Sequence, residues 1–247
     1  METITVLNTD INVTNIEEVA KKLTTENEMS VAICNANTLV RCYKDKKLNS
    51  MLNSFDIKCP DGFPVAKSSS ILYKNQQKRV DGYNVFLKTI EKGLENNTSH
   101  YFFGNEEFVT KKMIQKIKKS FPDVNVVGYK CPPVKSANDL ASDEYLSQVK
   151  DLDPDIIWVS LGFPKQEIFM NILKNMKICG SNLVGIGAVF EWVAGTKYKA
   201  PEIVANIGLE WVFRLLQEPK RLYKRYFVDN ILFIIYFIKQ YMTRKLR

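Results

Sequence analysis

Short apolar runs alternate with amphipathic segments over the first two thirds of the chain. The run at residues 156–160 is apolar on both faces, which is typical of a strand covered on both sides in a parallel sheet. The segment at 106–119 instead carries its apolar residues at helical spacing. This alternation is the pattern of βαβ units, and it predicts an α/β fold with a Rossmann-like open parallel sheet flanked by helices.

About six strands are predicted, with helices between them and no internal repeat. The strands are expected at residues 4–7, 30–34, 100–103, 124–127, 156–160 and 182–186, while 56–59 leads into the turn Pro60-Asp61-Gly62. The helices are expected from Asn15 to about Thr25, through 39–52, and at 83–94, 106–119, 138–149 and 164–176.

The pattern changes after about Gly195, where strand-like alternation stops. Residues 201–216, 219–228 and 231–242 are predicted as short, basic, aromatic-rich helices, and a proline suited to a first helical turn opens each of the first two. We therefore expect an α/β core at 1–196 and a helical appendage at 197–247.

Charge supports this division. The composition of the 247 residues is ordinary for a globular protein, with a formal net charge of +8. Residues 214–247 hold nine Lys and Arg against Glu218 and Asp229, so most of the positive charge lies in the appendage. The rest of the chain is almost neutral, which points to an anionic partner for the appendage alone.

The sequence lacks the residues that several kinds of functional site require. The five cysteines form no C-x-x-C pair, the single histidine rules out a multi-His metal site, and no P-loop motif is present. The sequence therefore predicts buried reduced thiols, no metal site and no cofactor. No signal peptide is apparent, and the longest apolar run, 231–238, is far shorter than the roughly 20 residues of a membrane span.

Three loops at the carboxyl ends of predicted strands are candidates for a site. They are residues 34–38, 60–64 and 162–167, and the loop 79–82 can reach the same sheet edge. Ligands of open α/β sheets bind at that edge.

These motifs carry a family resemblance. The chain resembles the WecG/TagA/CpsF family of bacterial glycosyltransferases over nearly its whole length. The matching stretches are Asn35-Ala36, Pro60-Asp61-Gly62, Arg79-Val-Asp-Gly82, Tyr101-Phe-Phe-Gly104, Gly162-Phe-Pro-Lys-Gln-Glu167, Gly185-Ile-Gly-Ala188, Ala194-Gly-Thr196, Ala200-Pro201, and Gly208-Leu-Glu-Trp-Val-Phe-Arg-Leu-Leu-Gln-Glu-Pro219 through Arg221 and Arg225-Tyr226.

The resemblance implies an inverting, metal-independent glycosyltransferase. It would move a sugar from a UDP-sugar to an undecaprenyl-diphosphate-linked sugar at the cytoplasmic face of the membrane, in the synthesis of a cell-surface polysaccharide such as a teichoic acid linkage, capsule or exopolysaccharide. N-acetylmannosamine is the favoured sugar, with glucose, galactose and N-acetylglucosamine left open.

The resemblance also assigns residues. Asp61 matches the catalytic base, and Arg79 and Gln166 match an active-site arginine and glutamine. Substrate contacts are expected from Asn35, Gly62, Gly82, Gly104, Gly162, Lys165, Gly185, Gly187, Glu191, Arg214, Arg221 and Arg225, the three arginines stabilising the departing UDP. Ile33 and Asn84 depart from the family pattern, in ways that could reflect a different donor sugar.

Aromatic, aliphatic and basic residues mix in the appendage, as in segments that lie on an anionic membrane surface. The appendage is expected to dock there and to close over the site. Alternatives are an ordinary helix packed on the core, a non-catalytic module that senses a nucleotide and binds membranes, and a nucleic-acid binder. Because the aromatic residues accompany an unbroken aliphatic run, we expect lipid rather than nucleic acid, and leave homo-oligomerisation open.

Overall fold

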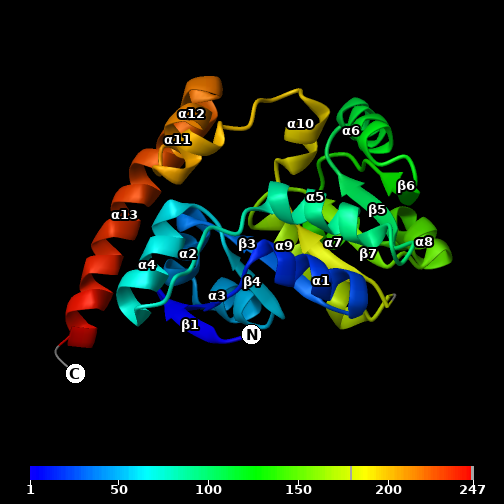
Figure 1. The fold of residues 1–247 in the computed structure, drawn as a ribbon. Coiled ribbons are helices and arrows are strands. Elements are labelled where there is room, and N and C mark those ends of the chain that lie inside the picture. Colours follow the sequence, from blue (N-terminus) through cyan, green and yellow to red (C-terminus); the bar gives the residue numbers. More distant parts are fainter. Residues whose placement is uncertain (179, 246–247) are drawn as a thin grey trace.

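The main sheet has six parallel strands. The structure, a computed structural model, describes residues 1–178 and 180–245, leaving the side chains of Lys224 and Arg225 outside the description. The strands are β3 (Ser30–Cys34), β4 (Ile57–Pro60), β5 (Ser99–Gly104), β6 (Asn125–Lys130), β7 (Ile156–Ser160) and β8 (Asn182–Gly185). Their order is β4-β3-β8-β7-β5-β6 (Figure 1). The predicted open parallel sheet is therefore confirmed.

A separate hairpin precedes the sheet. β1 (Thr3–Val6) pairs with β2 (Thr9–Asn12) in antiparallel register, so the strand expected at 4–7 lies outside the parallel sheet. Leu7 and Asn8 make the two-residue turn, both with positive φ. This is the geometry of tight hairpins, but the turn lacks the glycine by which such turns are usually predicted.

Helices cover both faces of the sheet. On one face lie α2 (Ala36–Lys44), α3 (Lys46–Asn53), α7 (Ala137–Leu140), α8 (Asp143–Leu152) and α9 (Lys165–Met176). On the other lie α1 (Ile16–Thr25), α5 (Gly82–Gly93), α6 (Glu107–Ser120) and α10 (Val189–Ala194). Successive residues of a strand alternate between the two cores: Ile157 and Val159 face one, and Trp158 faces the other.

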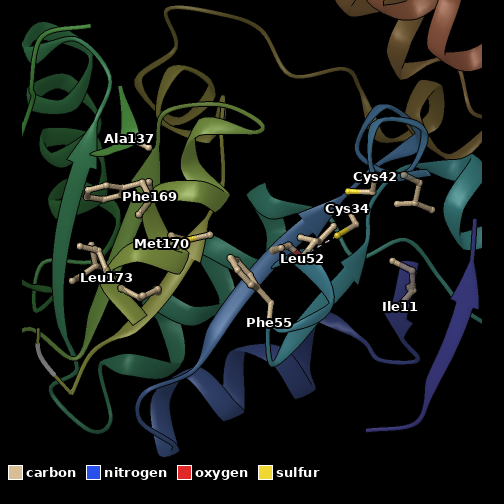
Figure 2. Packing of buried hydrophobic residues seen from close by; sticks show 14 of the residues in the cluster. Ile11, Cys34, Cys42, Leu52, Phe55, Ala137, Phe169, Met170 and Leu173 are labelled. Carbon is tan, nitrogen blue, oxygen red and sulfur yellow. Dashed lines mark hydrogen bonds between the residues drawn. The ribbon is translucent and has the colours of Figure 1, made fainter. Parts of the chain in front are cut away.

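Figure 2 shows the first of these cores. Phe169, Met170 and Leu173 of α9 pack against the sheet, and Leu52 and Phe55 fill the space beside Cys34. Cys34, Cys42 and Cys59 are free and fully enclosed, as expected for structural thiols. Cys131 is only half-buried, and Cys179 lies outside the described residues.

Two helical predictions were wrong in detail. The helix expected through 39–52 is two helices, because Asp45 ends α2 and caps α3, accepting hydrogen bonds from the backbone N–H groups of Lys47 (2.9 Å) and Leu48 (3.1 Å). Likewise, the helix expected at 138–149 is divided into α7 and α8. A further helix, α4 (Phe63–Tyr73), was not predicted and packs beside β1.

The C-terminal segment folds as α11 (Glu202–Asn206), α12 (Glu210–Gln217) and one long helix, α13 (Pro219–Lys245). The break expected after residue 228 is absent. No proline or glycine interrupts α13, and Asp229 accepts a hydrogen bond from the Asn37 side chain of α2, so the polar pair 229–230 is accommodated within the helix.

The far end of α13 returns to the N-terminal hairpin (Figure 1). Tyr236 stacks on Tyr43 of α2, with ring centroids 4.3 Å apart, and Phe233 is buried. The Gln240 side chain accepts from the Leu7 N–H (3.0 Å) and donates to the Thr5 carbonyl (2.9 Å). Among the described residues, no helix combines the length and hydropathy needed to cross a bilayer.

Candidate active site

All six strands of the main sheet end at one cavity of about 970 Å³. Each strand delivers the residues that follow it, namely Asn35, Asp61, Asn105, Cys131, Leu161 and Ile186. The opposite wall comes from the C-terminal segment, through Lys197, Glu210, Arg214, Glu218 and Arg221. The structure thus brings together the loops 34–38, 60–64 and 162–167 from distant parts of the chain, at the sheet edge where α/β ligands bind.

Asp61 follows β4, the outermost strand on one side of the main sheet. Its backbone N–H donates to the Cys34 carbonyl (2.9 Å), which fixes the turn after β4. Its carboxylate lines the cavity and forms no ion pair within 4 Å among the described residues. Burial, followed by the negative charges of Glu210 and Asp81, raises the pKa of Asp61 to about 7, although the charges of Arg79 and Arg214 act in the opposite direction.

Arg79 is held by carboxylates other than Asp61. It forms ion pairs with Glu210 of α12 and with Asp81, the N-cap of α5, at 3.4 Å. Asp81 is bound in turn by the Nζ of Lys199 at 3.3 Å and by the Asn84 side-chain amide at 2.7 Å. Asn84 therefore braces Asp81 rather than facing the cavity.

A second charged group lies where the C-terminal segment closes the cavity. Lys197 Nζ lies 2.5 Å from Glu191 and 2.9 Å from Glu218, and the Nε of Arg221 donates to Glu218 at 2.9 Å. Burial acts to raise the pKa of Glu218, but the hydrogen bonds from Arg221 and Lys197 outweigh it and lower the pKa to about 2. Glu218 is therefore a carboxylate at any working pH.

Arg214 of α12 lines the same cavities as Asp61, namely the large one and a smaller adjoining one of about 70 Å³. Its guanidinium stacks over the Trp192 ring, 5.2 Å from the centroid. No carboxylate pairs with Arg214 within 4 Å in the described part of the chain, whereas Arg221 shares Glu218 with Lys197. The Arg225 side chain lies outside the described residues.

Gln166 supports the loop after β8. Its Oε1 accepts from the Gly187 N–H (3.1 Å), and its Nε2 donates to Glu167 (2.9 Å). It is buried, and a Cβ at Gly185 would lie 2.9 Å from its Nε2. Gln166 therefore shapes the cavity floor through its protein contacts.

The glycines expected to touch substrate divide into two groups. Gly82, Gly162, Gly185 and Gly187 line the large cavity, and Gly62 lines the smaller one. Gly104 does not line either cavity: it has φ +108°, and a Cβ there would lie 2.5 Å from the Ser160 carbonyl oxygen. Gly104 is thus required by the packing of β5 against β7.

The other expected residues also line the large cavity. Asn35 caps α2, accepting from the Thr38 N–H at 3.2 Å, and Lys165 donates to the Lys135 carbonyl at 3.2 Å. Glu191 and Ile33 complete this part of the wall. Ile33, one of the two departures from the family pattern, brings an apolar side chain to this wall.

Sequence reasoning missed four residues of the site: Asp81, Lys197, Glu210 and Glu218. Three of them had a signal, because Asp81, Glu210 and Glu218 lie within the family motifs given above, whereas Lys197 lies in none of them. However, only the fold shows that Glu210 meets Arg79, 131 positions away. Within the described residues, no three His, Cys, Asp or Glu side chains gather so as to hold a metal ion.

Comparisons with known proteins agree on one family. The family model described as "Glycosyl transferase WecG/TagA/CpsF family" matches residues 4–247. An N-acetylglucosaminyldiphosphoundecaprenol N-acetyl-beta-D-mannosaminyltransferase of Bacillus spizizenii is 29% identical over 178 residues, covering 72% of this chain and 67% of the relative. The Bacillus subtilis protein of the same name is 26% identical over 191 residues, covering 77% and 72%.

Proposed function

Because the chain belongs to the WecG/TagA/CpsF family of glycosyltransferases, we propose that it transfers a sugar, with inversion, from a UDP-sugar to an undecaprenyl-diphosphate-linked sugar. N-acetylmannosamine is the favoured donor sugar, because the two Bacillus relatives are named for its transfer. N-acetylglucosamine is the favoured acceptor sugar for the same reason. The product would serve the synthesis of a cell-surface polysaccharide.

The observation that carries this proposal is the Asp61 carboxylate, open to the cavity with its pKa raised to about 7. A general base works best when its pKa lies near the working pH. In the proposed reaction Asp61 takes the proton of an acceptor hydroxyl as its oxygen bonds to the anomeric carbon. The bond from that carbon to the UDP oxygen breaks on the opposite side, which inverts the configuration.

The charge that develops on UDP needs compensation, and the cavity offers cations for it. Arg214, Arg221 and Lys197 face the same space as Asp61 from the C-terminal wall. Guanidinium groups suit a diphosphate because they donate two parallel hydrogen bonds. We assign charge stabilisation to these groups, so the proposed reaction requires no metal ion. Arg79 and Gln166 would position substrate indirectly, through Glu210, Asp81 and the loop after β8.

The proposal also divides the chain between chemistry and membrane contact. Residues 1–196 would form the catalytic core, and 197–247 a part that docks on the inner face of the membrane and closes the site. Exposed Ile231, Ile234, Ile235 and Ile238 on α13 support this role. They lie among basic residues, as in helices that rest in the headgroup region of an anionic bilayer.

The test is release of UDP from a panel of UDP-sugars, with N-acetylglucosamine linked to a lipid diphosphate as acceptor and EDTA present. We expect acceptor-dependent release from one donor. Asp61→Asn should lower the rate of UDP release by about a hundredfold or more, as expected for the loss of a general base. Folding should be unchanged, because the two side chains are nearly isosteric.

Asp123→Asn, an exposed aspartate outside the cavity, is the matched control and should keep full activity. Near-normal turnover by Asp61→Asn would contradict the mechanism. Nucleotide binding without turnover across several lipid-linked acceptors would favour a non-catalytic, nucleotide-sensing module.

A further inference from the structure

Glu210 connects the C-terminal segment to the candidate site through an ion pair with Arg79. The carboxylate comes from the first residue of α12, while Arg79 comes from the loop before α5. Their ion pair is well shielded, since the Arg79 side chain is 12% exposed and that of Glu210 is 20% exposed. Shielded pairs of this kind are screened much less by salt than surface pairs.

The ion pair with Glu210 determines which carboxylates the Arg79 guanidinium binds. Arg79 binds Glu210 and Asp81, and forms no ion pair within 4 Å with Asp61 among the described residues. Asp81 is already bound by Lys199. If Glu210 were withdrawn, Arg79 would lose one of its two carboxylate partners, and the charge of Arg79 already acts on Asp61.

Helix α12 is attached in a way that allows such withdrawal. None of its eight residues is buried, in contrast to the five buried residues of α9. Its side-chain contacts include the Glu210–Arg79 pair, the stacking of Arg214 on Trp192, and the ring contacts of Trp211 with Tyr226 and Phe227. Gln217 also exchanges two hydrogen bonds with the backbone of Tyr198, in the segment just before α11. Segments with little buried apolar surface are the ones that open at low free-energy cost.

We propose that Glu210 is a positioning residue that keeps Arg79 away from Asp61, so that the Asp61 carboxylate is free to act as the base only while α12 is docked. This rests on the role proposed above for Asp61. When α12 leaves, Glu210 leaves with it and Arg79 is released towards Asp61. A carboxylate paired with a guanidinium is a poor proton acceptor, so the undocked enzyme would not activate water against its donor.

Every charged group that faces Asp61 has a defined direction of effect. The negative charges of Glu210 and Asp81 raise its pKa, and the positive charges of Arg79 and Arg214 lower it. Cys59 on β4 also faces Asp61, but burial raises its pKa far above the working range, so it stays neutral. Lys199 acts through its pair with Asp81.

The experiment is the pH profile of kcat/KM, measured as UDP release with the lipid-linked acceptor. Activity should rise with pH as Asp61 loses its proton, with an acid limb near pH 7. Glu210→Gln removes a negative charge and should move that limb towards acid by about one pH unit, a relative gain of about fivefold at pH 6. Arg79→Gln removes a positive charge and should move it towards alkali.

In the double variant Glu210→Gln/Arg79→Gln, the acid limb should lie close to its wild-type position. The two lost charges have opposite sign and act on the same Asp61 carboxylate, so their effects should largely cancel. Glu210→Asp should restore most of the wild-type profile. Glu202→Gln, an exposed carboxylate of the neighbouring helix α11 that lines neither cavity, is the matched control and should leave the limb in place.

A second readout tests the release of Arg79 directly. Hydrolysis of the UDP-sugar without acceptor should fall further in Glu210→Ala than in Glu210→Gln, because only the amide still accepts a hydrogen bond from Arg79. The proposal would be overturned if the acid limb were unchanged in both Glu210→Gln and Arg79→Gln, or if it shifted equally in one direction in both. The Glu210–Arg79 ion pair would then have a purely structural role. Activity in Asp61→Asn would instead overturn the proposed function itself.

Discussion

Lys197 and Arg221 face the cavity with their charges shared by one carboxylate, that of Glu218. This arrangement keeps two cations together without leaving either unpaired next to buried surface. It also means that an arriving diphosphate must compete with Glu218 for the same donors. The residue that organises the cationic wall therefore also limits its affinity for anions.

Glu218→Gln should bind UDP more tightly than the wild type, by about threefold, which lies within the roughly 0.2–1 kcal/mol of a partly exposed ion pair. The amide oxygen can still accept from Arg221, while the competing charge is gone. Isothermal titration with UDP measures the difference. Glu26→Gln, which breaks an exposed pair with Lys22, should have no effect. Weaker UDP binding in Glu218→Gln would show that its charge supports the site instead.

At the scale of elements, α13 has two different faces. Leu222 and Phe233 are buried, Phe233 as part of the core, whereas Ile231, Ile234, Ile235 and Ile238 lie about half exposed on the opposite side. Deleting the whole helix would remove Phe233 from the core and uncover Tyr43, which stacks on Tyr236. Point substitutions on the outer face therefore separate the proposed membrane binding from folding more cleanly.

The paired substitutions Ile234→Glu and Ile238→Glu should weaken binding to vesicles that contain anionic lipid by about tenfold or more, equivalent to 1.4 kcal/mol. These residues are one helical turn apart, so both would meet the same membrane surface in the proposed docking. Vesicle sedimentation measures the change. Phe108→Glu on α6, also an exposed apolar side chain, is the control. An equal loss in the control, or no loss in the pair, would place the membrane contact elsewhere.

Elements with a strong local signal could be predicted, and elements shaped by distant contacts could not. The strand 156–160 was predicted at its true bounds because it is apolar on both faces. In contrast, α4 follows Gly62, a residue with φ +79° and no capping side chain, so Pro64 in its first turn was the one start signal that the sequence offered. The continuity of α13 through Asp229 depends on Asn37, 192 positions earlier.

The site shows the same limit. The turn 60–62 and the loop 162–167 could be placed at one sheet edge, since parallel strands end together. The partners of Arg79 could not be found, because Glu210 reaches it only after the C-terminal segment folds back over the cavity. Local pattern identifies which residues can do chemistry, and the fold decides what each is bonded to.

At the scale of the whole molecule, the sheet that separates the two hydrophobic cores carries one buried histidine, His100. His100 on β5 is almost completely buried, and its Nδ1 accepts from the Trp158 indole at 3.1 Å. Burial lowers the pKa of His100 to about 4, although Asp155 acts weakly in the opposite direction. The histidine is therefore neutral in the folded protein at pH values where the unfolded chain protonates it.

The unfolding free energy should fall as pH decreases from about 6.5, the ordinary histidine pKa, towards 4, by up to about 1.4 kcal/mol per pH unit from this residue. Above pH 6.5 the contribution is constant. Urea unfolding at several pH values should show a shallower decline for His100→Gln, which keeps an acceptor for Trp158. Identical pH slopes for the two proteins would contradict the assignment, and the chain has no other histidine to confuse the comparison.

The convergence of six strand ends on one cavity has an evolutionary consequence. The hydrogen-bond ladder and both cores are built from strand residues, while the cavity is lined from the loops that follow them. A loop such as 131–134, where Val134 is almost fully exposed, can therefore change its side chains without disturbing the sheet. Selection can alter the sugar that such an enzyme accepts one loop at a time, while the scaffold and the proposed base are inherited intact.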